Sequence, residues 1–208
     1  METRSAVSGK ETTQITPSGR GATRAPEGRH ASVGAAAARD ATLVFPEAPK
    51  RMSPMATRRL HKELSDWHLS GRTAESNPQP AIFLETPVTR LDEWFVSLRG
   101  VESTLYAGEV YRLRFRFPSD YPIEAPEVVF LGNPPVHEHV YSNGHLCLSI
   151  LYDNWSPALT VNSVALSIQS MLSSATQKRR PPDNDAYVRN CRGRSPKHTR
   201  WLFHDDGV

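Results

Sequence analysis

Cysteine is scarce in this chain of 208 residues, which has only Cys147 and Cys191, far apart in the sequence. With no apolar signal segment at the N-terminus, this scarcity points to a reducing compartment and not to a disulfide-bonded secreted protein. Long apolar runs are lacking too, since no stretch approaches the ~18 apolar residues of a membrane span. We therefore expect a cytoplasmic and/or nuclear protein with no membrane partner.

Apolar residues are few overall, at 38% of the sequence, and no aromatic residue precedes Phe45. Residues 1–54 are rich in Ala, Gly, Ser, Thr, Arg and Pro, which cannot bury enough apolar surface to offset the entropy lost on ordering. We expect residues 1–54 to form a disordered N-terminal extension. The net charge of +3 is modest, so no nucleic-acid partner is expected.

Beyond residue 54 the apolar residues follow helical and strand periodicities. A first amphipathic helix is predicted by the i, i+4, i+7 spacing of Leu60, Leu64 and Trp67. A second is predicted after the capping residue Thr160, with a core stripe formed by Val161, Val164, Ala165, Ile168, Met171 and Leu172. Between the helices, strands are predicted at 94–99, 111–117 and 128–131, and their short spacing suggests an antiparallel meander.

The window 136–151 concentrates reactive side chains, with three of the eight histidines and one of the two cysteines beside an Asn-Gly turn signal. Two chemistries fit it: a zinc site made by His137, His139, His145 and Cys147, or a thiolate nucleophile at Cys147. A buried structural cysteine beside surface histidines is the third interpretation. Structural zinc sites favour ligand pairs separated by two to four residues and more than one cysteine, so we expect no metal.

Ordered motifs surround Cys147. Before it comes Phe117-Pro118-x-x-Tyr121-Pro122-x-x-Ala125-Pro126, around it Gly144-His145-Leu146-Cys147-Leu148, and eight residues after it begins Trp155-Ser156-Pro157-Ala158. This succession, from about Met55 to Asp206, resembles the ubiquitin-conjugating enzymes. The resemblance is greatest to the W-type branch, through the segments 140–145, 178–184 and 201–206.

The resemblance implies an α/β (α+β) fold of the ubiquitin-conjugating type: an N-terminal helix, a four-stranded antiparallel meander, an active-site loop and a central helix. We place the core domain at 55–190. Residues 191–208 are basic and weakly periodic, and we expect them to form a flexible C-terminal tail.

The family's chemistry is thioester exchange. The resemblance implies that Cys147 accepts ubiquitin as a thioester from the activating enzyme and passes it to a substrate amine. A thiolate serves as nucleophile in the first step and as leaving group in the second. ATP is consumed by the activating enzyme, so no cofactor is expected on this chain. Cys191 has no motif around it and is interpreted as structural.

Two residues depart from the family's His-Pro-Asn motif. His139 stands where the family has an Asn credited with stabilising the oxyanion or its loop, and an imidazole N–H can donate the same kind of hydrogen bond. Glu138 replaces the Pro, which removes a rigid φ and adds negative charge near the thiol. Glu138 alone favours a competing interpretation, a catalytically weak or silent ubiquitin-binding scaffold.

The resemblance also implies partners: ubiquitin, the activating enzyme, RING or U-box ligases and protein substrates. It assigns Arg58 and Arg59 to contact with the activating enzyme, although from the residues alone a solvated helix face is the commoner meaning of such a pair. By position, a ligase surface would comprise Arg58, Ile123, Ser156, Pro157 and Ala158.

The W-type branch is associated with transfer to N-terminal α-amino groups. The loop after the second helix carries Lys178, Arg179 and Arg180 ahead of Asp183, and we expect this positive charge to disfavour an approaching lysine ammonium. In the alternative, Asp183 or Asp185 still reaches the site and ordinary lysine transfer persists.

Overall fold

The structure, a computed structural model, describes residues 51–201. Residues 1–50 and 202–208 lie outside the described part, and with them nearly all of the predicted disordered extension. No helix within 51–201 has both the length and the apolar character needed to cross a membrane.

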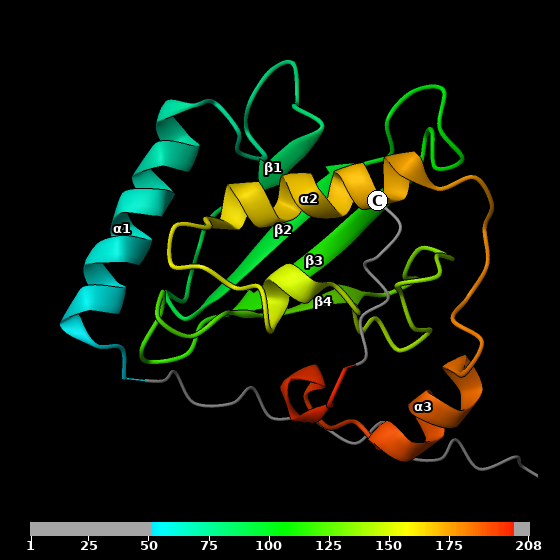
Figure 1. The fold of residues 1–208 in the computed structure, drawn as a ribbon. Helices are drawn as coiled ribbons and strands as arrows, with labels where there is room; N and C mark the ends of the chain where they lie inside the picture. The colour runs from blue at the N-terminus through cyan, green and yellow to red at the C-terminus, as the bar shows by residue number, and fades with distance from the viewer. Residues whose placement is uncertain (1–50, 202–208) are drawn as a thin grey trace, which may run out of the picture. The chain divides into compact units, whose positions relative to one another are not determined.

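Four strands form one antiparallel sheet in the order β1-β2-β3-β4, namely Ile82–Leu84, Glu93–Arg99, Val110–Arg116 and Glu127–Leu131 (Figure 1). This confirms the predicted meander. The alternation in β3 buries Tyr111, Leu113 and Phe115 on the core face. Leu113 lies opposite Val96 of β2 and Phe130 of β4 in the register, so apolar side chains line up across three strands.

Two long helices complete the core. Helix α2, Val161–Ser174, crosses one face of the sheet, while α1, Pro54–Leu69, lies to one side of it (Figure 1). Thr160 caps α2 as predicted, because its hydroxyl accepts the backbone N–H of Ser163. The cap of α1 is Ser53, so the domain begins before the predicted boundary at residue 55.

The C-terminal segment differs from the prediction. A third helix, α3 (Asn184–Cys191), is followed by a short 3-10 helix, Pro196–His198. Cys191, Pro196 and Trp201 are all buried. The predicted boundary at residue 191 therefore falls at the end of a packed helix, and residues 191–201 pack against the domain. Only 202–208 of the predicted tail lie outside the described residues.

Candidate active site

Cys147 lies on one arm of a small hairpin, and His139 lies opposite it on the other arm. The Cys147 backbone N–H donates to the His139 carbonyl at 2.9 Å, and the Tyr141 N–H donates to the His145 carbonyl at 2.9 Å. The turn requires Gly144, whose φ is +89° and where a Cβ would lie 2.1 Å from the Phe130 carbonyl oxygen. The hairpin thus brings together the two residues that were predicted to share the site.

His137 fixes the near side of this hairpin. Its side chain is buried, and its Nδ1 accepts the backbone N–H of His139 at 3.0 Å. Burial lowers the pKa of His137 to about 4, with His139 as the next cause, while Glu138 and a backbone hydrogen bond to Met171 oppose the shift. His137 is therefore neutral near pH 7 and ties the active-site loop to α2.

His137 and His145, two of the three histidines of this window, have separate partners. His145 Nδ1 forms a 2.8 Å hydrogen bond with the Tyr187 hydroxyl, while His137 Nδ1 is occupied by the main chain of His139. Across 51–201, no group of three or more His, Cys, Asp or Glu side chains is placed to hold a metal ion. The geometry therefore gives no support to the four-ligand zinc interpretation.

The two cysteines differ sharply in access. Cys147 is half-buried, whereas Cys191 is only 7% exposed. The Cys191 Sγ lies 3.2 Å from the Arg194 carbonyl oxygen and 3.7 Å from His145 Nδ1. No disulfide joins the two. Of the two thiols, Cys147 is the one that a large partner can reach.

The charges beside the hairpin are compensated, which corrects two expectations. Glu138 accepts two hydrogen bonds from Arg179, at 2.9 and 2.5 Å, and this partner lowers the pKa of Glu138. Lys178 pairs with Glu109. Arg179 therefore neutralises Glu138, the negative charge predicted near the thiol. Because Lys178 is also paired, two of the three cations predicted to repel an ammonium are already bound to carboxylates.

Arg180, the third cation of that loop, binds main chain. It donates to the carbonyls of Pro134, Pro135 and Val140, at 3.0, 2.6 and 3.1 Å. These three acceptors belong to the active-site loop. Arg180 thus fastens the loop after α2 to the loop that carries the cysteine.

Asp183 reaches the site through a tyrosine. The Tyr141 hydroxyl donates to Asp183 Oδ1 at 3.0 Å, and burial followed by this bond raises the pKa of Tyr141. The rings of Tyr187 and Trp201 pack at a tilt against Tyr141, with ring centroids 4.1 and 5.6 Å away. Sequence reasoning missed this aromatic cluster, although a tryptophan at the end of a basic segment was a signal that the segment packs.

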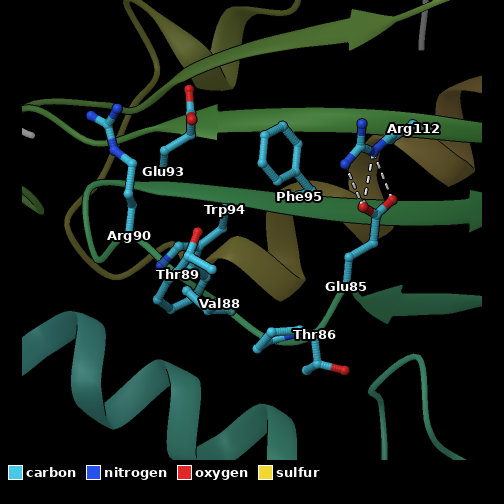
Figure 2. Close-up of a pocket in the computed structure, with 10 residues that line it drawn as sticks. Glu85, Thr86, Val88, Thr89, Arg90, Glu93, Trp94, Phe95 and Arg112 are labelled. Carbon is cyan, nitrogen blue, oxygen red and sulfur yellow. Dashed lines mark hydrogen bonds and ion pairs between the residues drawn. The ribbon is translucent and has the colours of Figure 1, made fainter. Parts of the chain in front are cut away.

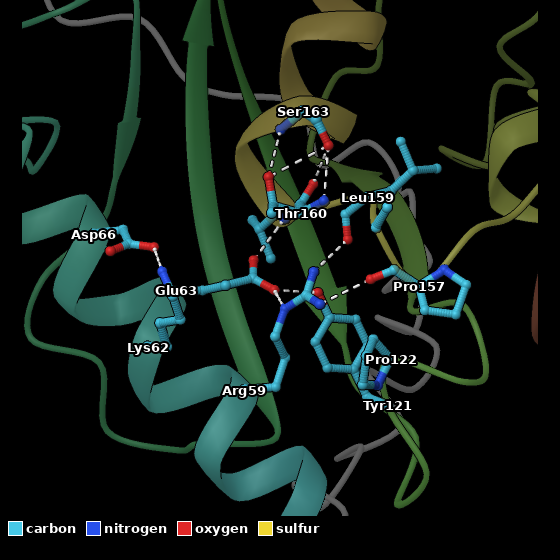
Figure 3. A network of polar contacts seen from close by, with 12 residues as sticks. Arg59, Lys62, Glu63, Asp66, Tyr121, Pro122, Pro157, Leu159, Thr160 and Ser163 are labelled. Carbon is cyan, nitrogen blue, oxygen red and sulfur yellow. Dashed lines mark hydrogen bonds and ion pairs between the residues drawn. The ribbon is translucent and has the colours of Figure 1, made fainter.

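The predicted partner-binding residues divide into two groups. Arg58, Ser156, Pro157 and Ala158 are exposed, and Ile123 is 62% exposed. Arg59 is different, because its guanidinium donates to Glu63 and to the carbonyls of Pro157 and Leu159 (Figure 3). Arg59 is therefore engaged inside the domain, and Arg58 is the arginine available to a partner.

A separate hollow of about 270 Å³ lies between β2 and the 85–90 loop (Figure 2). Arg112 pairs with Glu85 at 2.7 Å at its rim and lies 4.2 Å from the centre of the Phe95 ring. No residue predicted to act in the site lines this hollow. Its charged side chains are paired, Arg112 with Glu85, Glu93 with Arg116 and Arg90 with Asp92, as is usual on a solvated sheet face.

Comparison with known proteins agrees with this geometry. The profile of the family described as "Ubiquitin-conjugating enzyme" matches residues 59–204. The chain is 55% identical over 160 residues to ubiquitin-conjugating enzyme 15 of Arabidopsis thaliana, covering 76% of this chain and 94% of that protein. It is 52% identical over 157 residues to the probable ubiquitin-conjugating enzyme E2 W of Dictyostelium discoideum, covering 76% of this chain and all of that one.

A solved structure gives the same result. The crystal structure of the ubiquitin-conjugating enzyme UbcA1 of Agrocybe aegerita superposes with a TM-score of 0.60 at 41% identity, covering 66% of this chain and 95% of that one.

Proposed function

The chain belongs to the ubiquitin-conjugating enzyme family, whose members are transferases acting through a cysteine thioester, and we propose that its nucleophile is Cys147 and its preferred acceptor an α-amino group. In this scheme the activating enzyme loads ubiquitin onto Cys147, and a ligase promotes transfer to the acceptor. ATP is consumed by the activating enzyme, so this chain needs no cofactor site.

Accessibility supports Cys147 as the nucleophile. The thiol must meet the activating enzyme, ubiquitin and the acceptor in turn, which the buried Cys191 cannot do. The hairpin sets the backbone of His139 opposite that of Cys147. In this scheme the His139 ring N–H donates to the oxyanion of the tetrahedral intermediate. Arg179 compensates the negative charge of Glu138, so this charge no longer supports the interpretation as a catalytically silent scaffold.

The observation that carries the acceptor preference is that Asp183 and Glu138, two carboxylates near the hairpin, are already engaged. Asp183 accepts the Tyr141 hydroxyl, and Glu138 is paired with Arg179. A lysine acceptor needs such a carboxylate to orient it and help remove its proton. Near pH 7.4, roughly a quarter of α-amines but only ~0.1% of lysines are neutral, since their unperturbed pKa values are about 7.8 and about 10.4. An α-amine therefore attacks the thioester with the least help.

A discharge assay tests both parts. Ubiquitin is first loaded onto the chain by the activating enzyme and ATP. The loaded chain is then offered one of two flexible peptides. One has a free N-terminus and no lysine, and the other is the same peptide acetylated at its N-terminus and carrying one internal lysine. We expect discharge onto the first peptide. Faster discharge onto the lysine peptide would defeat the acceptor preference.

Variants of the two cysteines identify the nucleophile in the same assay. Cys147→Ala should abolish the thiol-sensitive ubiquitin adduct, and Cys147→Ser should give a slower oxyester. Cys191→Ala is the matched control, with unchanged loading. Normal loading of Cys147→Ala would overturn the assignment.

A further inference from the structure

Glu63 is a buried carboxylate at the junction of three segments. It is 3% exposed and lies on α1, facing the start of α2. One oxygen accepts Arg59 Nε and the Tyr121 hydroxyl, both at 2.6 Å. The other accepts the backbone N–H of Val161 at 2.8 Å. A buried carboxylate with this many donors is fully satisfied and holds its neighbours in fixed places.

Arg59 extends this network into the 156–160 loop. Its two terminal nitrogens donate to the carbonyls of Pro157 and Leu159, at 2.8 and 2.7 Å (Figure 3). The planar guanidinium can reach both carbonyls and Glu63 only from one orientation, and Glu63 fixes that orientation. The path of the loop is thus set by its backbone, which leaves the side chains of Ser156 and Ala158 exposed.

A second contact closes the network into a ring. Trp155, just before the loop, donates its Nε1–H to the Pro122 carbonyl at 2.8 Å, and Pro122 follows Tyr121. The ring therefore runs from Glu63 through Arg59, the 156–160 loop and Trp155 to the 121–123 segment, and returns through Tyr121. These are the three segments to which the proposed ligase surface belongs.

We propose that Glu63 is the positioning residue of the ligase surface: ligase binding depends on it, although it is buried and touches no partner. This inference rests on the proposed function, in which Ile123 and residues 156–158 meet a ligase. Without the carboxylate, Arg59 loses its fixed orientation and the loop samples paths that do not fit the ligase. The apparent ligase affinity is then reduced in proportion to the fraction of molecules that keep the competent loop path.

The test measures discharge of the loaded chain onto a lysine-free peptide at increasing ligase concentration. The ligase is the domain, from a panel of purified RING and U-box domains, that most accelerates the wild-type chain. For Glu63→Gln we expect the half-saturating ligase concentration to rise about tenfold. The maximal rate and the ligase-free rate should stay within about twofold of wild type, because the hairpin of Cys147 is not part of the ring.

The chain contains a matched control. Lys62 and Asp66 form an ion pair of the same i, i+4 spacing on α1, but both side chains are exposed and neither joins the ring (Figure 3). Asp66→Asn should leave the ligase titration unchanged. Thermal unfolding of each variant checks that it is folded.

A second variant keeps the proposal testable if Glu63→Gln fails to fold. Arg59→Lys retains the positive charge, but a single ammonium cannot span Glu63 and two carbonyls, so the same shift in half-saturation is expected.

The outcomes separate the two proposals. A wild-type ligase titration for folded Glu63→Gln overturns the positioning role, as does a ligase-free rate that falls in parallel with the stimulated one. Failure of the wild-type chain to load, or failure of every ligase domain to accelerate it, overturns the proposed function and this inference with it.

Discussion

His137 is a histidine that the fold requires in its neutral form. Its Nδ1 must accept the His139 N–H, which an imidazolium cannot do, and burial lowers its pKa to about 4. In the unfolded chain the pKa of His137 is near 6.5, so as the pH falls the unfolded state takes up a proton on this side chain before the folded state does. The stabilisation is therefore complete above about pH 6.5 and is lost as the pH falls towards 4.

We expect protonation of His137 to lower the free energy of unfolding by about 3 kcal/mol as the pH falls through that window. Urea unfolding of wild type and His137→Gln at several pH values measures it. The variant should be less stable at pH 7, and its deficit should shrink as the pH falls. Burial lowers the pKa of His145 too, so some slope should remain in the variant. A deficit that does not change with pH would contradict the assignment.

At the scale of elements, α1 carries two adjacent arginines with opposite surroundings. Arg58 is exposed, whereas the Arg59 side chain is 21% exposed and paired with the almost fully buried Glu63. Reversing the charge at Arg58 should slow loading by the activating enzyme without changing stability, because exposed charges steer encounter. Arg59→Glu should instead destabilise the domain by about 3 kcal/mol or more, because it leaves a buried carboxylate beside a like charge.

Loading kinetics and urea unfolding on both variants distinguish these effects. If Arg58→Glu loads at the wild-type rate, Arg58 belongs to a solvated helix face with no partner. Equal stability of the two variants would mean that the Glu63 pair contributes little.

The helices and the longer strands were predictable because their periodicity reflects a single buried face. The stripe after Thr160 and the alternation in β3 are examples, and both are confirmed. Strand β1 was not identified, since its three residues are all buried and show no alternation. Helix α3 was missed because its apolar content is low and because its Tyr187 packs against Tyr141, which is distant in the sequence, and against Trp201, which lies beyond the end of the helix.

In the site, the family resemblance implied that His139 acts beside Cys147, and the structure adds the hairpin that sets the two backbones opposite each other. Sequence reasoning could not predict that Arg179 would compensate Glu138, or that Arg180 would bind three carbonyls. Those contacts link residues about 40 positions apart, and a run of cations gives no information about its acceptors.

For the whole molecule, the start of the domain can be located by truncation. Ser53 caps α1, and its N–H donates to the Ser119 carbonyl at 3.1 Å. A chain that begins at Met52 should keep wild-type stability and loading. A chain that begins at Met55 should lose about 1 kcal/mol, the usual contribution of an N-cap.

Urea unfolding and thioester loading compare the two truncated chains, and Ser53→Ala in the full chain serves as the matched control for the cap. A large loss of loading in the chain that begins at Met52 would show that the N-terminal extension takes part in function.

The contacts of Arg59 with two carbonyls also bear on how such a protein changes over evolutionary time. Every residue type has a carbonyl, so substitutions at positions 156 and 158 can accumulate without moving the loop that displays them. In the proposed scheme, lineages can then diverge in the ligases that they recognise while inheriting one loop path. On this proposal, substitutions at positions 156 and 158 change recognition, whereas a substitution at the buried Glu63 changes the path of the whole loop.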